Sequence, residues 1–183
     1  MTPESGADGS LGQLIAELIR LDGAQRGVAF SHVGDDHPFA SLAGTWRGEG
    51  RGEYPTIADF RYTEELTISP IPGRPIAAWR SATRDAVTGE PKHGESGYLR
   101  STPQGIELVI AHTFGVVETT AGTLERGNLT LRSTGLLGTA SAKQINGVQR
   151  RYHFDAGSLQ YTVSMAAVGV PLTHHLSADL HRE

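Results

Sequence analysis

FRYTEELTI (residues 60–68) decides the fold class, because its side chains alternate in polarity with a period of two. Such alternation is typical of a half-buried β-strand, whose successive side chains point to opposite faces of a sheet. Four apolar side chains share one face of this strand: Phe60, Tyr62, Leu66 and Ile68. The adjacent residues Glu64 and Glu65 must point to opposite faces, which excludes a paired-carboxylate hydrolase site here.

Segments of the same kind recur along the chain, separated by turn signals at PIPG, VTGEP, TPQG, TFG and DAGS. We count about nine or ten such strands, at intervals of about 8 to 15 residues. Connections this short predict antiparallel neighbours, because a parallel pair needs a crossover of about a dozen residues or more. The sequence therefore predicts an all-β fold, either an up-and-down barrel or a sandwich. A closed barrel has no exposed sheet edges, and with about ten strands it has room for one ligand.

The amino-terminal part of the chain has a different pattern. Residues 1–10 are predicted to be a disordered tail, and LGQLIAELIRL (11–21) has the apolar spacing of one short amphipathic helix. A loop rich in glycine and aspartate follows, and strand patterns begin near residue 42. We expect a tail at 1–10, a helix and loop extension at 11–40, and a single barrel domain at 41–183.

Composition excludes several classes of function. The net charge is −4 and basic residues do not cluster, so nothing indicates binding to nucleic acid. The absence of cysteine excludes disulfides, zinc–thiolate sites, thiol catalysis and covalent haem attachment, so any metal must be held by histidine or carboxylate. No apolar run approaches the roughly 18 to 20 residues of a membrane-spanning helix. The polar start MTPESGADGS does not resemble a secretory signal, so the cytoplasm is the expected location.

The glycine-rich stretch LAGTWRGEG (42–50) superficially resembles a phosphate-binding loop. A dinucleotide fingerprint needs a helix after the glycines, whose amino terminus receives the pyrophosphate, and here another strand pattern follows. Glycines inside a strand more often mark bends or close backbone approaches. We therefore interpret Gly44, Gly48 and Gly50 as bend points on the first barrel strand, and Trp46 as a plug at one end.

Five segments together resemble the nitrobindin family of haem-binding β-barrels, whose ferric members are described as peroxynitrite isomerases. In chain order they are GTWRGEG (44–50), YPTI (54–57), HGESGYLR (93–100), ELVIAH (107–112) and MAAVGVPLTHHLSADLHR (165–182). The resemblance covers roughly residues 40–183 and leaves the amino-terminal extension outside it. It implies a ten-stranded antiparallel barrel, similar to lipocalins and fatty-acid-binding proteins, that holds one haem b per chain. It also implies isomerisation of peroxynitrite to nitrate at ferric iron, and binding of nitric oxide when the iron is ferrous.

The resemblance also implies roles for individual residues. The axial iron ligand, and with it the catalytic centre, falls on His175, and the histidine on the opposite face of the haem falls on His93. Thr56 and Arg150 fall on further positions that contact the haem. A neutral imidazole nitrogen is a suitable axial donor for haem iron. His112 is expected to be a structural residue at a strand end.

The last strand carries two histidines, and two lines of reasoning about them disagree. Alternation groups His174 with Leu172, Leu176, Ala178 and Leu180, which would send His174 inward and His175 to solvent. The motif favours His175 as the ligand, and then the apolar face would be the outer one. That outer face would pack against the amino-terminal segment or against a second copy in a homodimer. Asp179 departs from expectation, because a small or apolar residue is expected near a haem on the face of His175.

A non-catalytic carrier is the alternative function. Arg150 and Tyr152 lie two residues apart and so share one strand face. Fatty-acid-binding proteins, which this fold resembles, hold a lipid carboxylate with such a pair, and a bidentate arginine with a tyrosine hydroxyl suits a buried carboxylate. The alternative is thus a carrier of a fatty acid or another apolar acid.

Overall fold

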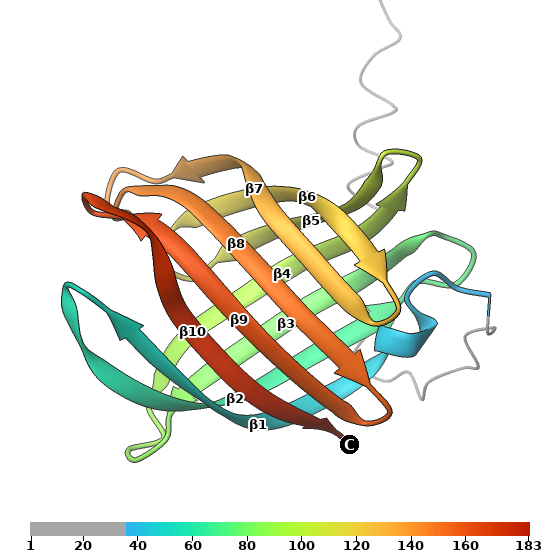
Figure 1. Ribbon diagram of the computed structural model, residues 1–183, viewed down its shortest axis with the longest axis horizontal. Coiled ribbons are helices and arrows are strands. Elements are labelled where there is room, and N and C mark those ends of the chain that lie inside the picture. The colour runs from blue at the N-terminus through green and yellow to red at the C-terminus, as the bar shows by residue number, and fades with distance from the viewer. Residues whose placement is uncertain (1–35) are drawn as a thin grey trace, which may run out of the picture. The chain divides into compact units, whose positions relative to one another are not determined.

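The computed structural model describes residues 36–183, and in it ten antiparallel strands form one closed barrel (Figure 1). Of the two all-β folds that the strand pattern left open, the structure has the barrel that the family resemblance implied, and it is not a sandwich. The helix expected at 11–21 lies outside the described residues, which contain one short 3₁₀ helix, η1 (Ala40–Leu42). The strands are β1 (Gly44–Tyr54), β2 (Ile57–Pro70), β3 (Ile76–Asp85), β4 (Pro91–Thr102), β5 (Gly105–His112), β6 (Val116–Glu125), β7 (Asn128–Gly138), β8 (Ile145–Asp155), β9 (Ser158–Ala167) and β10 (Val170–Arg182).

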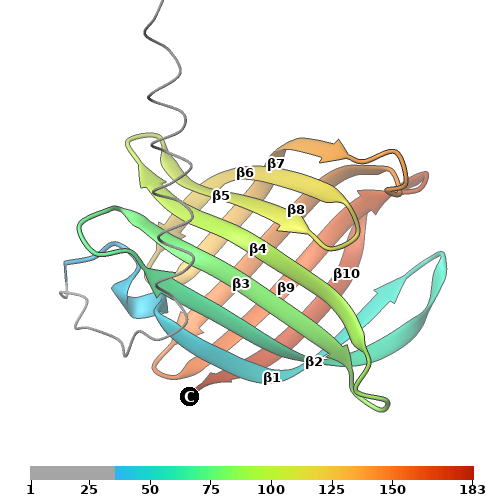
Figure 2. The ribbon, with the colours of Figure 1, turned by 180° about the vertical axis from the view of Figure 1, so that it is seen from behind.

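Each strand pairs with its neighbours in the chain, and the barrel closes where β1 pairs with β10. Trp46 at the start of β1 is opposite Arg182, and Gly52 near its end is opposite Leu176. Figure 2 shows from behind how β1 to β5 complete the wall that β6 to β10 form in Figure 1. This up-and-down order places the five hairpins β1–β2, β3–β4, β5–β6, β7–β8 and β9–β10 at one end of the barrel.

Large apolar side chains close the opposite end. Trp46 is fully buried, and its indole nitrogen donates a hydrogen bond of 3.0 Å to the carbonyl oxygen of Leu42 in η1. The Phe154 ring packs edge-on against the indole at 5.4 Å between centroids, and the Arg182 guanidinium lies 4.4 Å from the indole ring centre. The indole thus plugs this end, as the sequence predicted.

The other end of the barrel carries a ring of exposed apolar side chains, which we call the apolar rim. All the exposed large hydrophobic residues in the range 36–183 lie on or beside the five hairpins named above: Ile57, Val87, Phe114, Val117, Leu137, Val168 and Leu172. Exposed apolar groups that gather around an opening are typical of a ligand entrance or contact surface. The fold therefore has one plugged end and one apolar opening.

The glycines of β1 make room for aromatic rings of β2. Gly50 is the register partner of Tyr62, and Gly52 is the partner of Phe60. A Cβ atom on Gly50 would lie 2.2 Å from the Tyr62 ring, and one on Gly52 would lie 2.1 Å from the Phe60 ring. Close approach of these rings is thus a physical reason for glycine at these positions.

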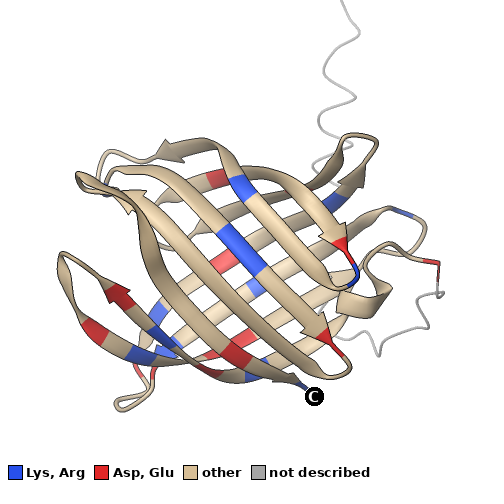
Figure 3. Ribbon diagram, viewed as in Figure 1, with Lys and Arg blue, Asp and Glu red and all other residues tan. Residues whose placement is uncertain are grey.

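Charged residues of both signs are interspersed along the strands seen in Figure 3. Several form ion pairs between neighbouring strands, such as Arg47 with Glu65 at 2.6 Å and Arg61 with Glu49 at 2.8 Å. This distribution agrees with the absence of a nucleic-acid footprint in the sequence. The helical content of residues 36–183 includes nothing long and apolar enough to traverse a lipid bilayer.

Candidate functional site

A cavity of about 620 Å³ occupies the barrel interior below the apolar rim. This volume is in the range of about 300 to 1,000 Å³ that is usual for small-molecule and cofactor sites. Its walls near the opening are mainly apolar and include Ile57, Phe60, Phe114, Leu136, Ile145 and Met165. The lining also includes a polar group that we call the polar floor: His93, Glu95, His112, Glu118 and Arg150, of which Glu118 and Arg150 are buried. A second hollow of about 730 Å³ is lined by exposed, paired groups such as Arg61 and Glu49.

A β-bulge in β10 directs His175 into the cavity. His174 is the register partner of Ser164 on β9, but the next pair is Leu176 with Val163, so β10 has one extra residue at this point. Bulges interrupt alternation and re-aim side chains. His175 and Leu176, although adjacent in sequence, therefore both line the cavity.

The bulge resolves the disagreement about the two histidines, because His175 can face inward together with the apolar residues that follow it. Ala178 and Leu180 are buried inside, whereas Asp179 is exposed and accepts a hydrogen bond of 2.7 Å from the Gln160 amide. The prediction of an apolar outer face on this strand, on which the homodimer rested, is wrong. Asp179 does not face the cavity, so it poses no obstacle to a haem there.

The His175 ring is held in one orientation. Its Nδ1 atom donates to the carbonyl oxygen of Glu53 at 3.0 Å, so the tautomer has its lone pair on Nε2. Nothing in the range 36–183 hydrogen-bonds to Nε2. The rings of Tyr54 and Phe60 pack edge-on against the imidazole at 5.2 and 6.4 Å. Burial lowers the pKa of His175, which favours the neutral, metal-binding form.

An arginine between two carboxylates is at the centre of the polar floor. Arg150 donates from Nη2 to Glu118 at 2.8 Å and to Glu95 at 3.0 Å, and from Nη1 to the second oxygen of Glu95 at 3.3 Å. Burial alone would raise the pKa of Glu95 and Glu118, but the Arg150 guanidinium holds both below their usual range. Both carboxylates are therefore ionised at neutral pH.

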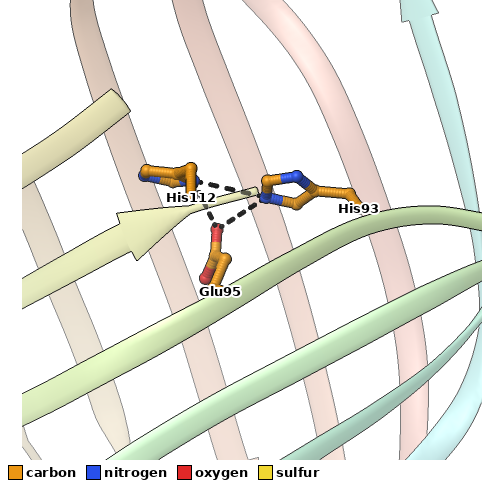
Figure 4. A group of neighbouring side chains, drawn as sticks. All are labelled: His93, Glu95 and His112. Carbon is orange, nitrogen blue, oxygen red and sulfur yellow. Dashed lines mark hydrogen bonds and ion pairs between the residues drawn. The ribbon is translucent and has the colours of Figure 1, made fainter. Parts of the chain in front are cut away.

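Two histidines complete the floor on the side of β4 and β5 (Figure 4). His93 Nε2 and His112 Nδ1 lie 3.3 Å apart, and each lies 3.6 Å from the same oxygen of Glu95. The other ring nitrogen of His112 lies 3.2 Å from Glu118, and the Phe114 ring stacks over both imidazoles. His112 thus belongs to the cavity wall, where the sequence suggested a structural residue at a strand end.

A further carboxyl group, that of Glu64, lies buried beside the floor. It accepts hydrogen bonds from Ser81 at 2.6 Å and from the Tyr161 hydroxyl, and that hydroxyl also lies 2.7 Å from the Tyr62 hydroxyl. Burial raises the pKa of Glu64, and the two hydroxyl donors only partly oppose this effect. The exclusion of a Glu64–Glu65 pair is confirmed, because Glu65 is on the outer face in an ion pair with Arg47.

The remaining predicted residues lie at different depths. His93 is half-buried in the cavity wall, and Arg150 is only 5% exposed at the floor. Thr56 is exposed in the β1–β2 turn and does not line the cavity, although its neighbour Ile57 does. The glycine motif lies in β1 and contributes space rather than chemistry.

The contacts of Arg150 argue against the carrier function. Its two terminal nitrogens already bond to Glu95 and Glu118, and the Tyr152 hydroxyl lies 3.3 Å from Nη1. The Arg150–Tyr152 pair therefore exists as predicted, but carboxylates of the protein itself occupy the place that a lipid carboxylate would take. The carrier is accordingly not favoured.

Sequence reasoning assigned no role to Glu64 or to the carboxylates of the polar floor. Glu64 shares a strand face with Tyr62 and Leu66, and Glu95 shares one with His93, so alternation alone places each of them inward. An acidic residue on the apolar face of a strand was the available signal, because a buried charge needs a partner. The partner that such a buried charge meets depends on strands that are distant in the sequence. Arg150, for example, belongs to β8.

Comparison with known proteins gives a consistent result. A family model described as the THAP4-like, heme-binding beta-barrel domain matches residues 36–182. The chain is 44% identical over 158 residues to "Peroxynitrite isomerase 1" of Mycolicibacterium paratuberculosis, which covers 81% of this chain and 98% of that protein. It is 42% identical over 149 residues to "Peroxynitrite isomerase" of Nocardia farcinica, with 79% and 88% covered.

A solved structure shows the same barrel. The crystal structure of Rv2717c from M. tuberculosis superposes with a TM-score of 0.71 at 35% sequence identity. The similar region covers 79% of this chain and 94% of that chain. The match thus extends over nearly the whole of the solved protein.

Proposed function

This chain belongs to the family of THAP4-like, haem-binding β-barrel domains, and on that premise we propose that it is a haem-dependent peroxynitrite isomerase. Relatives at 42 to 44% identity carry that name, which supports the same reaction here. The observation that carries the proposal is the bulged, inward-facing His175, whose Nε2 has no hydrogen-bond partner in the described part of the chain. We propose that His175 would supply the nitrogen donor that holds the iron of one haem b per chain.

The residues present fit such a group. The cavity has the volume of a cofactor site, and apolar side chains dominate its walls near the opening. The donor is a neutral imidazole whose second nitrogen is anchored to a backbone carbonyl, the arrangement that tunes and orients metal-bound histidines. Lys92 also lines the cavity, 5.0 Å from the centre of the Phe60 ring, and forms an ion pair of 3.0 Å with Asp85.

When bound, ferric haem would supply a Lewis-acidic iron at which the O–O bond of peroxynitrite is broken and nitrate is produced. The residues of the chain have the tasks of holding the donor, excluding water and orienting a small ligand. His175 offers its donor atom without rearrangement, because Glu53 and the neighbouring rings fix the imidazole. The apolar rim would limit access of bulk water to the opening.

The polar floor would face the small ligand. We propose that in the haem-loaded chain His93, half-buried in the wall, donates a hydrogen bond to a ligand oxygen, and that Thr56 contacts the haem from the β1–β2 turn. Arg150 bonds to two carboxylates, so we propose that it contributes by holding Glu95 and the floor in place. Haem held by His175 would also bind nitric oxide when its iron is ferrous.

The test is a hemin titration of the haem-free chain, followed by reaction of the loaded protein with peroxynitrite. Wild type should bind one equivalent with a Soret band and raise the ratio of nitrate to nitrite among the products. His175→Ala should lose the ferric spectrum and the catalysis. His174→Ala is the matched control, because this neighbouring histidine does not line the cavity, and it should behave as wild type. An unchanged ferric spectrum in His175→Ala would overturn the assignment.

A further inference from the structure

The side chains of His93, Glu95 and His112 place three ligand atoms close together in the cavity wall (Figure 4). These atoms are His93 Nε2, His112 Nδ1 and Glu95 Oε1, separated by 3.3, 3.6 and 3.6 Å. We propose that they form a binding site for one divalent cation, with Zn²⁺ as the preferred ion. The site lies in the haem cavity and shares His93 with the proposed isomerase site, but it does not include His175 and is proposed for the haem-free chain, so it goes beyond the isomerase function.

The three separations match a tetrahedral ion. Ligands placed about 2.0 to 2.2 Å from a tetrahedral zinc lie about 3.3 to 3.6 Å from one another. An octahedral ion with ligands about 2.0 to 2.1 Å away, such as Mg²⁺, would need adjacent ligands about 2.9 Å apart. Two imidazoles and one carboxylate also form a donor set that suits zinc and other first-row transition ions better than Mg²⁺ or Ca²⁺.

The backbone of β4 and β5 fixes the ligands on one face. His93 and Glu95 are two residues apart on β4, so both point inward. Glu95 is the direct register partner of His112 on β5, which places the two side chains side by side on the same face. Ligands mounted on paired strands keep their geometry more precisely than ligands on loops.

Surrounding groups orient the ligand atoms. Donation from His112 Nε2 to Glu118, at 3.2 Å, leaves the lone pair of Nδ1 for the ion, and such carboxylate–histidine–metal chains are usual around zinc. Thr113 Oγ1 lies 3.5 Å from Nδ1 of His93, so this ring nitrogen would have a hydroxyl partner when Nε2 binds the ion. Glu118 is fully buried, and its Oε1 atom has no hydrogen-bond partner within the described residues.

The formal charge of the floor also favours a cation. Glu95 and Glu118 carry two negative charges against the single positive charge of Arg150, which leaves one negative charge in a buried environment. A divalent ion compensates that charge. With three protein ligands, a fourth position would face the cavity, an arrangement typical of zinc sites that bind water or a small anion.

The experiment is a titration of the full-length, haem-free and chelator-treated chain with Zn²⁺ by calorimetry, and with Co²⁺ by visible spectroscopy. We expect one equivalent of each ion, with the d–d bands of tetrahedral Co²⁺. Glu118→Gln should weaken Zn²⁺ binding by about 10- to 100-fold. His93→Ala and His112→Ala should weaken it at least as much, since each removes a ligand.

Controls separate this site from the haem site and from misfolding. His174→Ala and His175→Ala should bind Zn²⁺ as wild type does, even where His175→Ala loses hemin. Circular dichroism shows whether each variant folds. If His112→Ala does not fold, His93→Ala still tests the proposal, because His93 is only half-buried. The proposal is overturned if wild type binds less than one equivalent, if His93→Ala binds unchanged, or if His175→Ala abolishes Zn²⁺ binding.

Discussion

Replacing Arg150 with methionine tests the electrostatics of the polar floor. The side chain is 6% exposed and contacts one oxygen of Glu118 and both oxygens of Glu95. Methionine fills similar space without charge, so the substitution leaves two buried carboxylates with no cationic partner among these contacts. A carboxylate in this position must either remain ionised in a poor solvent or take up a proton.

The expected cost is about 3 to 5 kcal/mol at pH 7, the usual penalty for breaking a buried pair by removing one partner. In wild type the pKa values of Glu95 and Glu118 are lowered, so their stabilising contribution is present above the unfolded pKa and is lost as pH falls. In Arg150→Met the same pKa values should be raised, so the variant regains stability as pH falls. The difference in the free energy of unfolding between wild type and Arg150→Met should therefore narrow as pH falls. It should narrow by about 1.4 kcal/mol per pH unit for each carboxyl that becomes protonated.

Urea unfolding of both proteins, followed by tryptophan fluorescence at pH 7 and pH 5, measures this difference in the free energy of unfolding. The triple variant Arg150→Met, Glu95→Gln, Glu118→Gln is the matched control, because it removes the buried charges together and should recover most of the lost stability. If the free energy of unfolding of Arg150→Met at pH 7 lies within about 1 kcal/mol of the wild-type value, Arg150 does not stabilise two ionised carboxylates, and the prediction is refuted.

Two further changes test the packing of β1 and the buried carboxyl of β2. Gly50→Ala should lose about 1 to 3 kcal/mol in urea unfolding, because its Cβ would lie 2.2 Å from the Tyr62 ring. Gly147→Ala, whose Cβ would lie 3.9 Å from the nearest atom, should stay within about 0.5 kcal/mol, and equal losses in both variants would contradict the space-making role. The pKa of Glu64 is raised in the folded chain, so wild type loses stability as pH rises above about 4.3, the pKa in the unfolded chain, until Glu64 has ionised in the folded chain. Glu64→Gln has no such carboxyl, so its stability relative to wild type should increase over the same pH range. Unfolding at pH 4, 6 and 8 measures the difference in stability between Glu64→Gln and wild type. A difference that does not change with pH would contradict the raised pKa of Glu64.

The fold was predictable because its signals are local. Alternation in residues 60–68 and turn residues between short segments require only the chemistry of neighbouring residues, and they predicted the antiparallel strands that the structure confirms. The barrel rather than a sandwich followed from the family motifs. The plug role of Trp46 followed from the same kind of reasoning. The glycines of β1 were identified as special, but the rings that need their space belong to β2 and appear only when the register is known.

The site itself depended on contacts between distant strands. Local alternation sent His174 inward, and only the extra residue of β10 against β9 turns His175 toward the cavity. Arg150 was expected to be free for a ligand carboxylate, yet β4 and β6 bring Glu95 and Glu118 to it. The sequence by itself determined the strands, the barrel and the family pattern, because periodicity and motifs are written along the chain. Tertiary structure alone decided which side chains meet in the cavity, because register, bulges and the pairing of buried charges arise only when separate strands pack together.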